Sequence, residues 1–298
     1  MLTSELTQYG VVVFRGTSLT DESHLEFARN FGELDDVKPY IKAGRPNRLK
    51  YDELFDVSNV EVDGTILDPE SPRGQANNVS FHDPLRGFDH KVTQTLQGNN
   101  LFHVDSSFNA RRAGYSLLLA HELPPPGMGG HTAFADTRTA YDDLSSELKE
   151  QLKTHNYIAA HSTHHSRKLA SPEYFAEMDP QDYPMGRHYL LQRHEASGRM
   201  NLYIASHVHH IEGLEPEKSQ ELFNQLYDHA KSDKYTVEIE WVSPGDLVIW
   251  DNTCTMHRAV GGPFLRKYRQ DMRRATVHDS SSQAWGLNEH SDMRVGLP

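Results

Sequence analysis

The sequence contains a single cysteine, Cys254, so no intrachain disulfide can form. No apolar stretch approaches the ~20 residues that cross a bilayer, which argues against a transmembrane helix. The first residues lack a basic segment followed by a long apolar core, so we predict no secretory signal. Together these absences favour a cytoplasmic protein that does not bind membranes.

Long runs of basic residues are absent as well. Lysine and arginine number 30 against 42 aspartates and glutamates, giving a formal net charge of −12. A protein that binds nucleic acid needs a basic face to displace phosphate counterions, so we expect no nucleic-acid partner. A small-molecule substrate is expected instead, because a few buried arginines can create a local positive field. The sequence leaves a homo-oligomer open.

Short strands joined by glycine- and proline-rich turns dominate the 298 residues. We expect strands at 10–14, 55–60, 116–120, 132–134, 157–161, 189–193, 201–204, 235–241, 247–250 and 272–277, with helices over 20–32, 138–144, 145–152 and from 215 onwards. This pattern predicts a mainly β fold with peripheral helices, a double-stranded β-helix (jelly-roll) barrel. We expect one domain over 1–298, with an irregular lid or substrate segment over 35–97.

His103 and Asp105 form the first motif that carries chemistry. In an extended segment residues i and i+2 point to the same face, so both side chains can bind one ion. A second histidine, His257, follows the apolar strand 247–250 and a short turn. Two histidines and one carboxylate on one face of an octahedron leave three positions open, as in Fe(II) oxygenases. A catalytic zinc ion needs only one open position.

A basic strand, 269–274, follows His257. A 2-oxo diacid that chelates the metal leaves its second carboxylate several ångströms away, where a forked guanidinium and a hydroxyl suit it. Thr132, after the Gly129-Gly130 turn, can supply that hydroxyl.

These motifs resemble the taurine dioxygenase / 2,4-dichlorophenoxyacetate dioxygenase family of Fe(II)/2-oxoglutarate oxygenases. The similar stretches are 10–15, 27–33, 103–108, 129–132 with 135–136, 250–258 and 273–276, in the family's order. The resemblance implies a dioxygenase that uses Fe(II), 2-oxoglutarate and O₂ to oxidise a C–H bond of a small anionic substrate, releasing succinate and CO₂. It implies that His103, Asp105 and His257 are the catalytic iron ligands and that Thr132 helps to hold 2-oxoglutarate. Asn99 falls where family members contact substrate.

The sequence departs from the family in its arginines, which the family places four residues apart. Alignment on the Arg-Ala-Thr tail puts Gln270 and Arg274 at these positions, whereas counting from His257 suggests Arg269 and Arg273. We expect Arg274 to contribute to co-substrate binding, with Arg269 as the substitute anchor. The chain also begins almost at the family's first strand, so we expect a leading segment to be missing.

Histidine is abundant, with 19 residues, so its presence alone is weak evidence for a metal site. Two clusters are His161, His164 and His165, and His207, His209 and His210. We expect the first on a polar strand or loop, in solvent-facing or hydrogen-bonded roles. The second resembles a metal site more closely, but no carboxylate or cysteine lies beside it at ligand spacing. Cys254 lacks an activating base and is expected to be a small packed residue.

Two alternatives use the same residues. A non-catalytic metal-binding jelly-roll module is favoured by Gln270, because a glutamine in place of an arginine weakens co-substrate binding. A zinc hydrolase built on His103, Asp105 and His257 would act without O₂.

Overall fold

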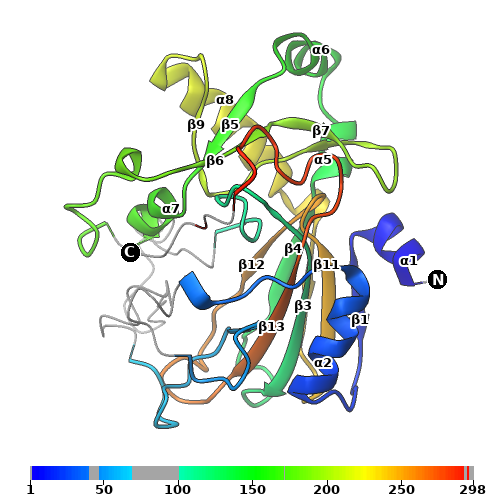
Figure 1. Ribbon diagram of the computed structural model, residues 1–298, viewed down its shortest axis with the longest axis vertical. Coiled ribbons are helices and arrows are strands. Elements are labelled where there is room, and N and C mark those ends of the chain that lie inside the picture. Colours follow the sequence, from blue (N-terminus) through cyan, green and yellow to red (C-terminus); the bar gives the residue numbers. More distant parts are fainter. Residues whose placement is uncertain (1, 40–46, 69–100, 171, 292–293, 295–298) are drawn as a thin grey trace.

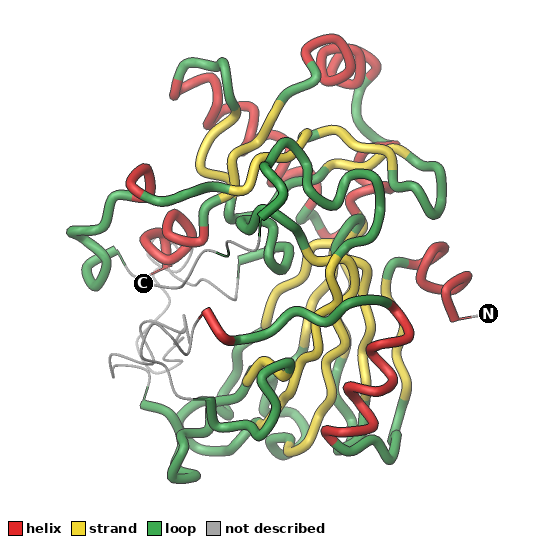
Figure 2. The backbone as a smooth tube through the Cα atoms, in the orientation of Figure 1, coloured by secondary structure: helices red, strands yellow, loops and turns green. Residues whose placement is uncertain are grey.

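The computed structural model describes residues 2–39, 47–68, 101–170, 172–291 and 294 (Figure 1). Within these ranges the strands form four sheets, and Figure 2 shows them gathered into a lower and an upper group. The largest sheet has the order β1-β11-β3-β13-β2. Its strands are β1 (Val11–Phe14), β2 (Leu54–Asp56), β3 (Ala113–Glu122), β11 (Leu247–Asp251) and β13 (Asp271–His278). The chain is therefore mainly β, as the sequence predicts.

Three smaller sheets complete the strands of the described residues. One has the order β10-β4-β12, with β10 (Thr236–Ile239), β4 (Thr132–Asp136) and β12 (Thr255–Ala259). Another has the order β6-β5-β9, with β6 (Gly186–Tyr189), β5 (Ile158–His161) and β9 (Val208–Ile211). The last pairs β7 (Leu191–Arg193) with β8 (Met200–Leu202).

Helices lie outside the sheets. They are α1 (Leu2–Tyr9), α2 (Asp21–Ala28), α5 (Thr137–Asp142), α6 (Ser146–His155), α7 (Thr163–Ala170) and α8 (Pro216–Ala230), with short 3-10 turns η1 (Arg29–Phe31), η3 (Pro180–Asp182) and η4 (Asp233–Tyr235). In Figure 1, α1 and α2 lie beside β1 on one side of the five-stranded sheet. No helix of the described residues combines the length and the apolar character needed to cross a membrane.

The two main sheets are the five-stranded sheet and the β10-β4-β12 sheet. Alternation along their strands decides which side chains lie in the space between them. On β3, Leu117 and Leu119 pack with residues of α1 and α2, whereas Leu118 and Ala120 pack between the sheets. Phe134 of the three-stranded sheet and Trp250 of the five-stranded sheet belong to the same inner cluster. Even-numbered positions of β3, β11 and β13 therefore face inward, next to the candidate active site.

Helix starts follow the capping residues in the sequence. Thr20 caps α2 and Ser145 caps α6, each through its side-chain oxygen. Asp136 caps α5, and its carboxylate accepts from the backbone N–H of Arg138.

Four details differ from the sequence predictions. The expectation of a strand or loop at His164 and His165 is wrong, since both lie on α7. The short turn after β11 is present, but it leads into a further strand, β12, which carries His257 and which the sequence did not predict. The single strand expected over 189–193 is divided between β6 and β7, and α1 precedes β1. Neither α1 nor α7 has a long apolar periodicity, which explains why the pattern did not indicate them.

Candidate active site

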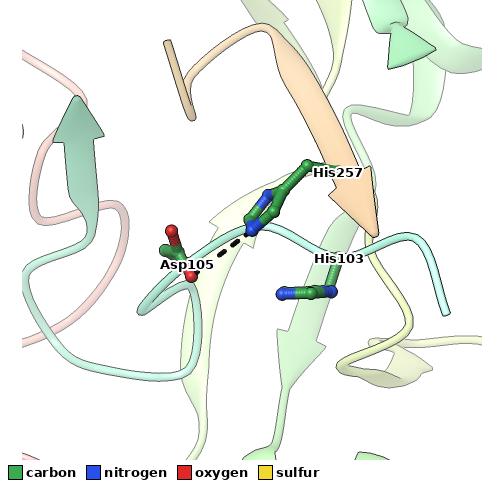
Figure 3. Close-up of side chains that lie close together, drawn as sticks. All are labelled: His103, Asp105 and His257. Atoms are coloured by element: carbon green, nitrogen blue, oxygen red, sulfur yellow. Dashed lines mark ion pairs between the residues drawn. The ribbon is translucent and has the colours of Figure 1, made fainter. Parts of the chain in front are cut away.

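His103 and His257 are held side by side by the backbone. They form an isolated antiparallel bridge in which the N–H of each residue donates to the carbonyl of the other, both at 2.9 Å. Asp105 lies two residues further on, and its Oδ1 is 3.7 Å from His257 Nε2. One ligand atom from each side chain lies within 4.8 Å of the others, and Figure 3 shows the three side chains converging. The structure thus brings together the three residues predicted to bind the metal.

The protonation states of this group suit a metal ion. His103 Nδ1 lies 2.9 Å from the carbonyl oxygen of Leu101, so Nδ1 carries the proton and Nε2 keeps its lone pair. Burial lowers the pKa of His103 and lowers that of His257 well below its usual range, which keeps both imidazoles neutral. Burial alone would raise the pKa of Asp105, but the Arg274 guanidinium and the hydrogen bond from Ser116 favour the ionised carboxylate, and the pKa is lowered to about 2.

The carboxylate of Asp105 is almost fully buried, at 5 % exposure, and both of its oxygens are engaged. Arg274 Nη1 donates to Oδ1 at 2.5 Å, and the hydroxyl of Ser116 donates to Oδ2 at 2.7 Å. Arg274 is oriented further by its Nε–H, which donates to the Thr276 hydroxyl at 3.0 Å. The sequence analysis singled out Arg274 but missed Ser116, which is identified only by its inward position on β3.

The other residues predicted to bind co-substrate lie at different distances from this centre. Thr132 begins β4, two positions before Phe134, which pairs with His257 across the sheet. The Thr132 hydroxyl accepts from Trp241 Nε1 at 3.2 Å. Arg269 is partly exposed, where it pairs with Glu122 and donates to the carbonyl of Gly64. Asn99 lies outside the described residues.

The contacts of Gln270, just before β13, and of Arg273, on β13, indicate which side chains of this segment point between the two main sheets. The Gln270 amide donates to the carbonyl of Gly130 at 2.9 Å, close to the start of β4. Arg273 points the opposite way and pairs with Asp21 at the start of α2. Gln270 and Arg274 thus lie on the inward face, which agrees with the register taken from the Arg-Ala-Thr tail.

His207 is a residue at this centre that the sequence analysis did not place there. Its ring packs edge-on against His103, with centroids 5.8 Å apart, and against Phe108 at 5.0 Å. Its Nδ1 lies 2.8 Å from the hydroxyl of Ser166 on α7. No group of three potential metal ligands within the described ranges includes His207, His209 or His210. The position of His207 follows from the loop before β9, and no local sequence signal indicates it.

A second buried group contains His194, Asp251 and Cys254, again with ligand atoms within 4.8 Å of one another. His194 Nε2 lies 3.0 Å from Asp251 Oδ2, and His194 Nδ1 lies 2.6 Å from the hydroxyl of Ser197. The other oxygen of Asp251 accepts from the N–H and hydroxyl of Thr253. Burial raises the pKa of the Cys254 thiol well above its usual range, so the thiol stays protonated.

The first group, and not the second, fits a mononuclear Fe(II) ion. It offers two neutral imidazoles and one ionised carboxylate on neighbouring segments of backbone, the donor set of non-haem Fe(II) oxygenases. His257 Nδ1 is buried without a hydrogen-bond partner among the described residues, and His257 Nε2 faces the Asp105 carboxylate. The inward guanidinium of Arg274 adds a positive charge that suits an anionic ligand.

Comparison with known proteins points to the same chemistry. Residues 2–276 match the family described as taurine catabolism dioxygenase TauD, TfdA family. The chain is 37% identical over 275 residues to the alpha-ketoglutarate-dependent 2,4-dichlorophenoxyacetate dioxygenase of Burkholderia sp. (strain RASC), covering 92% of this chain and 83% of the relative. It is 32% identical over 267 residues to the (S)-phenoxypropionate/alpha-ketoglutarate-dioxygenase of Sphingobium herbicidovorans, covering 87% and 79%.

Among solved structures, the crystal structure of AAD-2 in complex with Mn(II) and N-oxalylglycine superposes with a TM-score of 0.79. The two sequences are 32% identical, and the match covers 94% of this chain and 88% of the other. A structure described as a taurine dioxygenase from Burkholderia xenovorans superposes with a TM-score of 0.66 at 22% identity, which shows a shared fold.

Proposed function

This chain belongs to the taurine catabolism dioxygenase TauD, TfdA family, and from that membership we propose which of its residues carry the reaction and which acids it oxidises. The chain is a 2-oxoglutarate-dependent dioxygenase. It uses Fe(II), 2-oxoglutarate and O₂ to oxidise a C–H bond of a small anionic molecule, releasing succinate and CO₂. The alternatives of a non-catalytic metal-binding module and of a zinc hydrolase are not favoured by these relatives.

We assign the iron to His103 Nε2, one oxygen of Asp105 and the imidazole of His257. The observation that carries this assignment is the convergence of these three side chains within 4.8 Å. When bound, Fe(II) would activate O₂ with electrons from the oxidative decarboxylation of 2-oxoglutarate. The chain's own contribution is to keep the imidazoles neutral, to orient the carboxylate and to exclude water from this buried face.

We place 2-oxoglutarate between the two main sheets. Arg274 is an inward guanidinium of β13 beside the metal ligands, and Thr132 supplies a hydroxyl from the facing sheet. Gln270 lies on the same inward face as Arg274, nearer to Thr132, and adds an uncharged donor. Arg269 remains an alternative anchor only if its contacts with Glu122 and Gly64 are exchanged for the co-substrate.

For the primary substrate we propose an aryloxyalkanoic acid. The relatives named above act on 2,4-dichlorophenoxyacetate and on (S)-phenoxypropionate, which share a carboxylate and an aromatic ring. The described part of the centre offers matching groups, since the His207 imidazole packs against His103 and the Phe108 ring packs against His207. We propose that these two rings border the substrate and that Asn99 contributes from the segment outside the described residues.

We also propose that the five-stranded and β10-β4-β12 sheets form a jelly-roll barrel in one domain over 1–298. Phe134 and Trp250 from the two sheets share one cluster, which supports this closure. The ligand His257 lies on the smaller sheet, whereas Arg274 lies on the larger one.

The assignment is tested by anaerobic titration of apo-protein with Fe(II) and then 2-oxoglutarate. We expect the weak visible charge-transfer band of a 2-oxo acid chelated to iron, followed by succinate release with phenoxyacetates. His103→Ala should lose both. A band without phenoxyacetate-dependent succinate would refute the substrate class alone, and succinate formed equally by His103→Ala would refute the ligand assignment.

A further inference from the structure

Asn252 lies directly after β11, and its side-chain amide has only one possible orientation. The amide oxygen accepts from the backbone N–H of Asp105 at 3.2 Å and from the indole N–H of Trp250 at 3.1 Å. Both partners are donors only, so they fix which end of the amide is oxygen. The Asn252 NH₂ group must therefore point to its remaining neighbour, the hydroxyl of Ser116, at 2.9 Å.

The fixed amide also fixes the hydroxyl proton of Ser116. A hydroxyl has one proton, and the Asn252 NH₂ group can only donate to it. The Ser116 proton is thus directed to Asp105 Oδ2, 2.7 Å away. The result is a one-way relay from Asn252 through Ser116 to Oδ2, in a region where Ser116 and Asn252 are both fully buried.

Strand register explains why these residues meet. Ser116 on β3 lies opposite Trp250 on β11 and opposite Thr276 on β13. All three are even-numbered, inward positions. Arg274, which donates to the Thr276 hydroxyl, also donates to Asp105 at this level of the sheet. The central strands of the larger sheet thus support the carboxylate from behind.

We propose that Ser116 and Asn252 are positioning residues that keep Asp105 a one-oxygen ligand. The relay holds Oδ2 in a hydrogen bond and so fixes the rotation of the carboxylate, which turns Oδ1, the oxygen that accepts from Arg274 and lies 3.7 Å from His257 Nε2, toward the metal. A carboxylate that bound through both oxygens would take one of the three positions that the 2-oxo acid and O₂ need. This inference rests on the proposed function.

Removing the relay should therefore affect metal binding before it affects folding. Outer-shell partners of ligating carboxylates typically change metal affinity 10–100-fold. We expect Ser116→Ala to weaken Fe(II) binding about 10- to 100-fold. Asn252→Ala should act in the same direction but less, because the hydroxyl remains and only its orientation is lost. On metal-saturated protein, 2-oxoglutarate should bind more weakly to Ser116→Ala than to the parent.

The experiment measures three quantities anaerobically on the full chain. These are the Fe(II) Kd by chelator competition, the 2-oxoglutarate Kd from the charge-transfer band, and the Tm of the apo-protein. Asn201→Ala is the matched control. Asn201 is equally buried and also joins a hydroxyl, that of Thr137, to the β11–β12 turn through the carbonyl of Thr253, but it contacts no metal ligand.

A loss of Fe(II) affinity in Ser116→Ala and Asn252→Ala, with none in Asn201→Ala at a similar drop in Tm, supports the proposal. An unchanged Fe(II) Kd in a folded Ser116→Ala protein overturns it, and so does an equal loss in Asn201→Ala. If Asn252→Ala fails to fold, Ser116→Ala alone decides. If the parent binds Fe(II) but shows no 2-oxoglutarate band, the proposed function fails while the Fe(II) comparison still tests the relay.

Discussion

Two buried groups of potential metal ligands stand out in the described part of the chain, and they differ in what their polar atoms contact. In the group of His194, Asp251 and Cys254, the imidazole nitrogens and carboxylate oxygens contact one another or nearby hydroxyl and N–H groups. In the group of His103, Asp105 and His257, ligand atoms face one another across a wider gap, with 3.7 Å between carboxylate and imidazole. Residue type alone therefore does not distinguish a metal site, since the two groups differ in the spacing and contacts of their ligand atoms.

Adjacent residues at the end of β11 contact the two groups. Asp251 is an odd-numbered position of β11 and meets His194 on the outer side, whereas Asn252 meets Ser116 and Asp105 on the inner side. One strand end thus supports both groups, and substitutions can distinguish the proposed metal centre from a buried hydrogen-bond network.

Removal of a side chain from the inner group, which consists of His103, Asp105 and His257, should give the largest change in Fe(II) binding. We expect His257→Ala to weaken Fe(II) binding by more than about 100-fold, the upper limit for residues that only support a ligand. Turnover should disappear, because the remaining two ligands cannot hold the metal in its three-open-position geometry. Fe(II) titration and succinate assays measure this, and near-parental affinity would exclude His257 as a ligand.

A substitution in the outer group, which consists of His194, Asp251 and Cys254, should affect the free energy of unfolding instead. His194→Ala leaves the buried Asp251 carboxylate without its imidazole partner, and the loss of this hydrogen bond to a charged group should cost about 1.5–3 kcal/mol of unfolding free energy. Because His194 contacts no inner ligand in the described structure, the Fe(II) Kd of the folded variant should stay near the parental value. Urea denaturation and Fe(II) titration of one preparation test both statements, and a large loss of Fe(II) affinity would contradict the separation.

Acid should act on the inner group at a defined pH. Burial lowers the pKa of His103 and His257 below 6.5, the value of an unperturbed histidine, so both stay neutral as the pH falls to 6.5. Protons therefore compete with Fe(II) at a lower pH than they would at an unperturbed histidine. We expect the Fe(II) Kd to change little from pH 8 to 6.5 and binding to weaken under more acidic conditions. A decline that begins above pH 6.5 would show that the imidazoles are not protected.

Cys254 should give the smallest effect. It is 1 % exposed, and Cys254→Ala removes one buried sulfur atom, which we expect to cost about 1 kcal/mol of stability. As the one cysteine of the chain, it is also the only source of a thiolate-to-metal charge-transfer band. Co(II)-loaded parent protein should lack that band, and its presence would make the outer group a second metal site.

The sequence predicted that His103 and Asp105 lie together because their i, i+2 spacing has a direct geometric meaning. It also predicted most strands, since their alternation and turn residues are local properties. Arg274 and Gln270 were placed by aligning a short tail, and the contacts of Arg274 with Asp105 and of Gln270 with Gly130 agree with that alignment.

The supporting residues were not predictable in the same way. Ser116 meets Asp105 only because β3 pairs in one register with both β11 and β13, and register is a property of the assembled sheet. The contact of His207 with His103 depends on a loop before β9, and the pairing of His194 with Asp251 joins segments far apart in the chain. Such contacts leave no periodic signal.

The backbone bridge between His103 and His257 has a consequence for how this enzyme can diverge. Because main-chain hydrogen bonds set the spacing of these two ligands, the long stretch of chain between them is free to gain or lose residues in its loops. That stretch includes α7 and His207, which lie on the side assigned to substrate. Acceptance of new acids can therefore evolve by insertion and deletion there, while the iron chemistry is inherited unchanged.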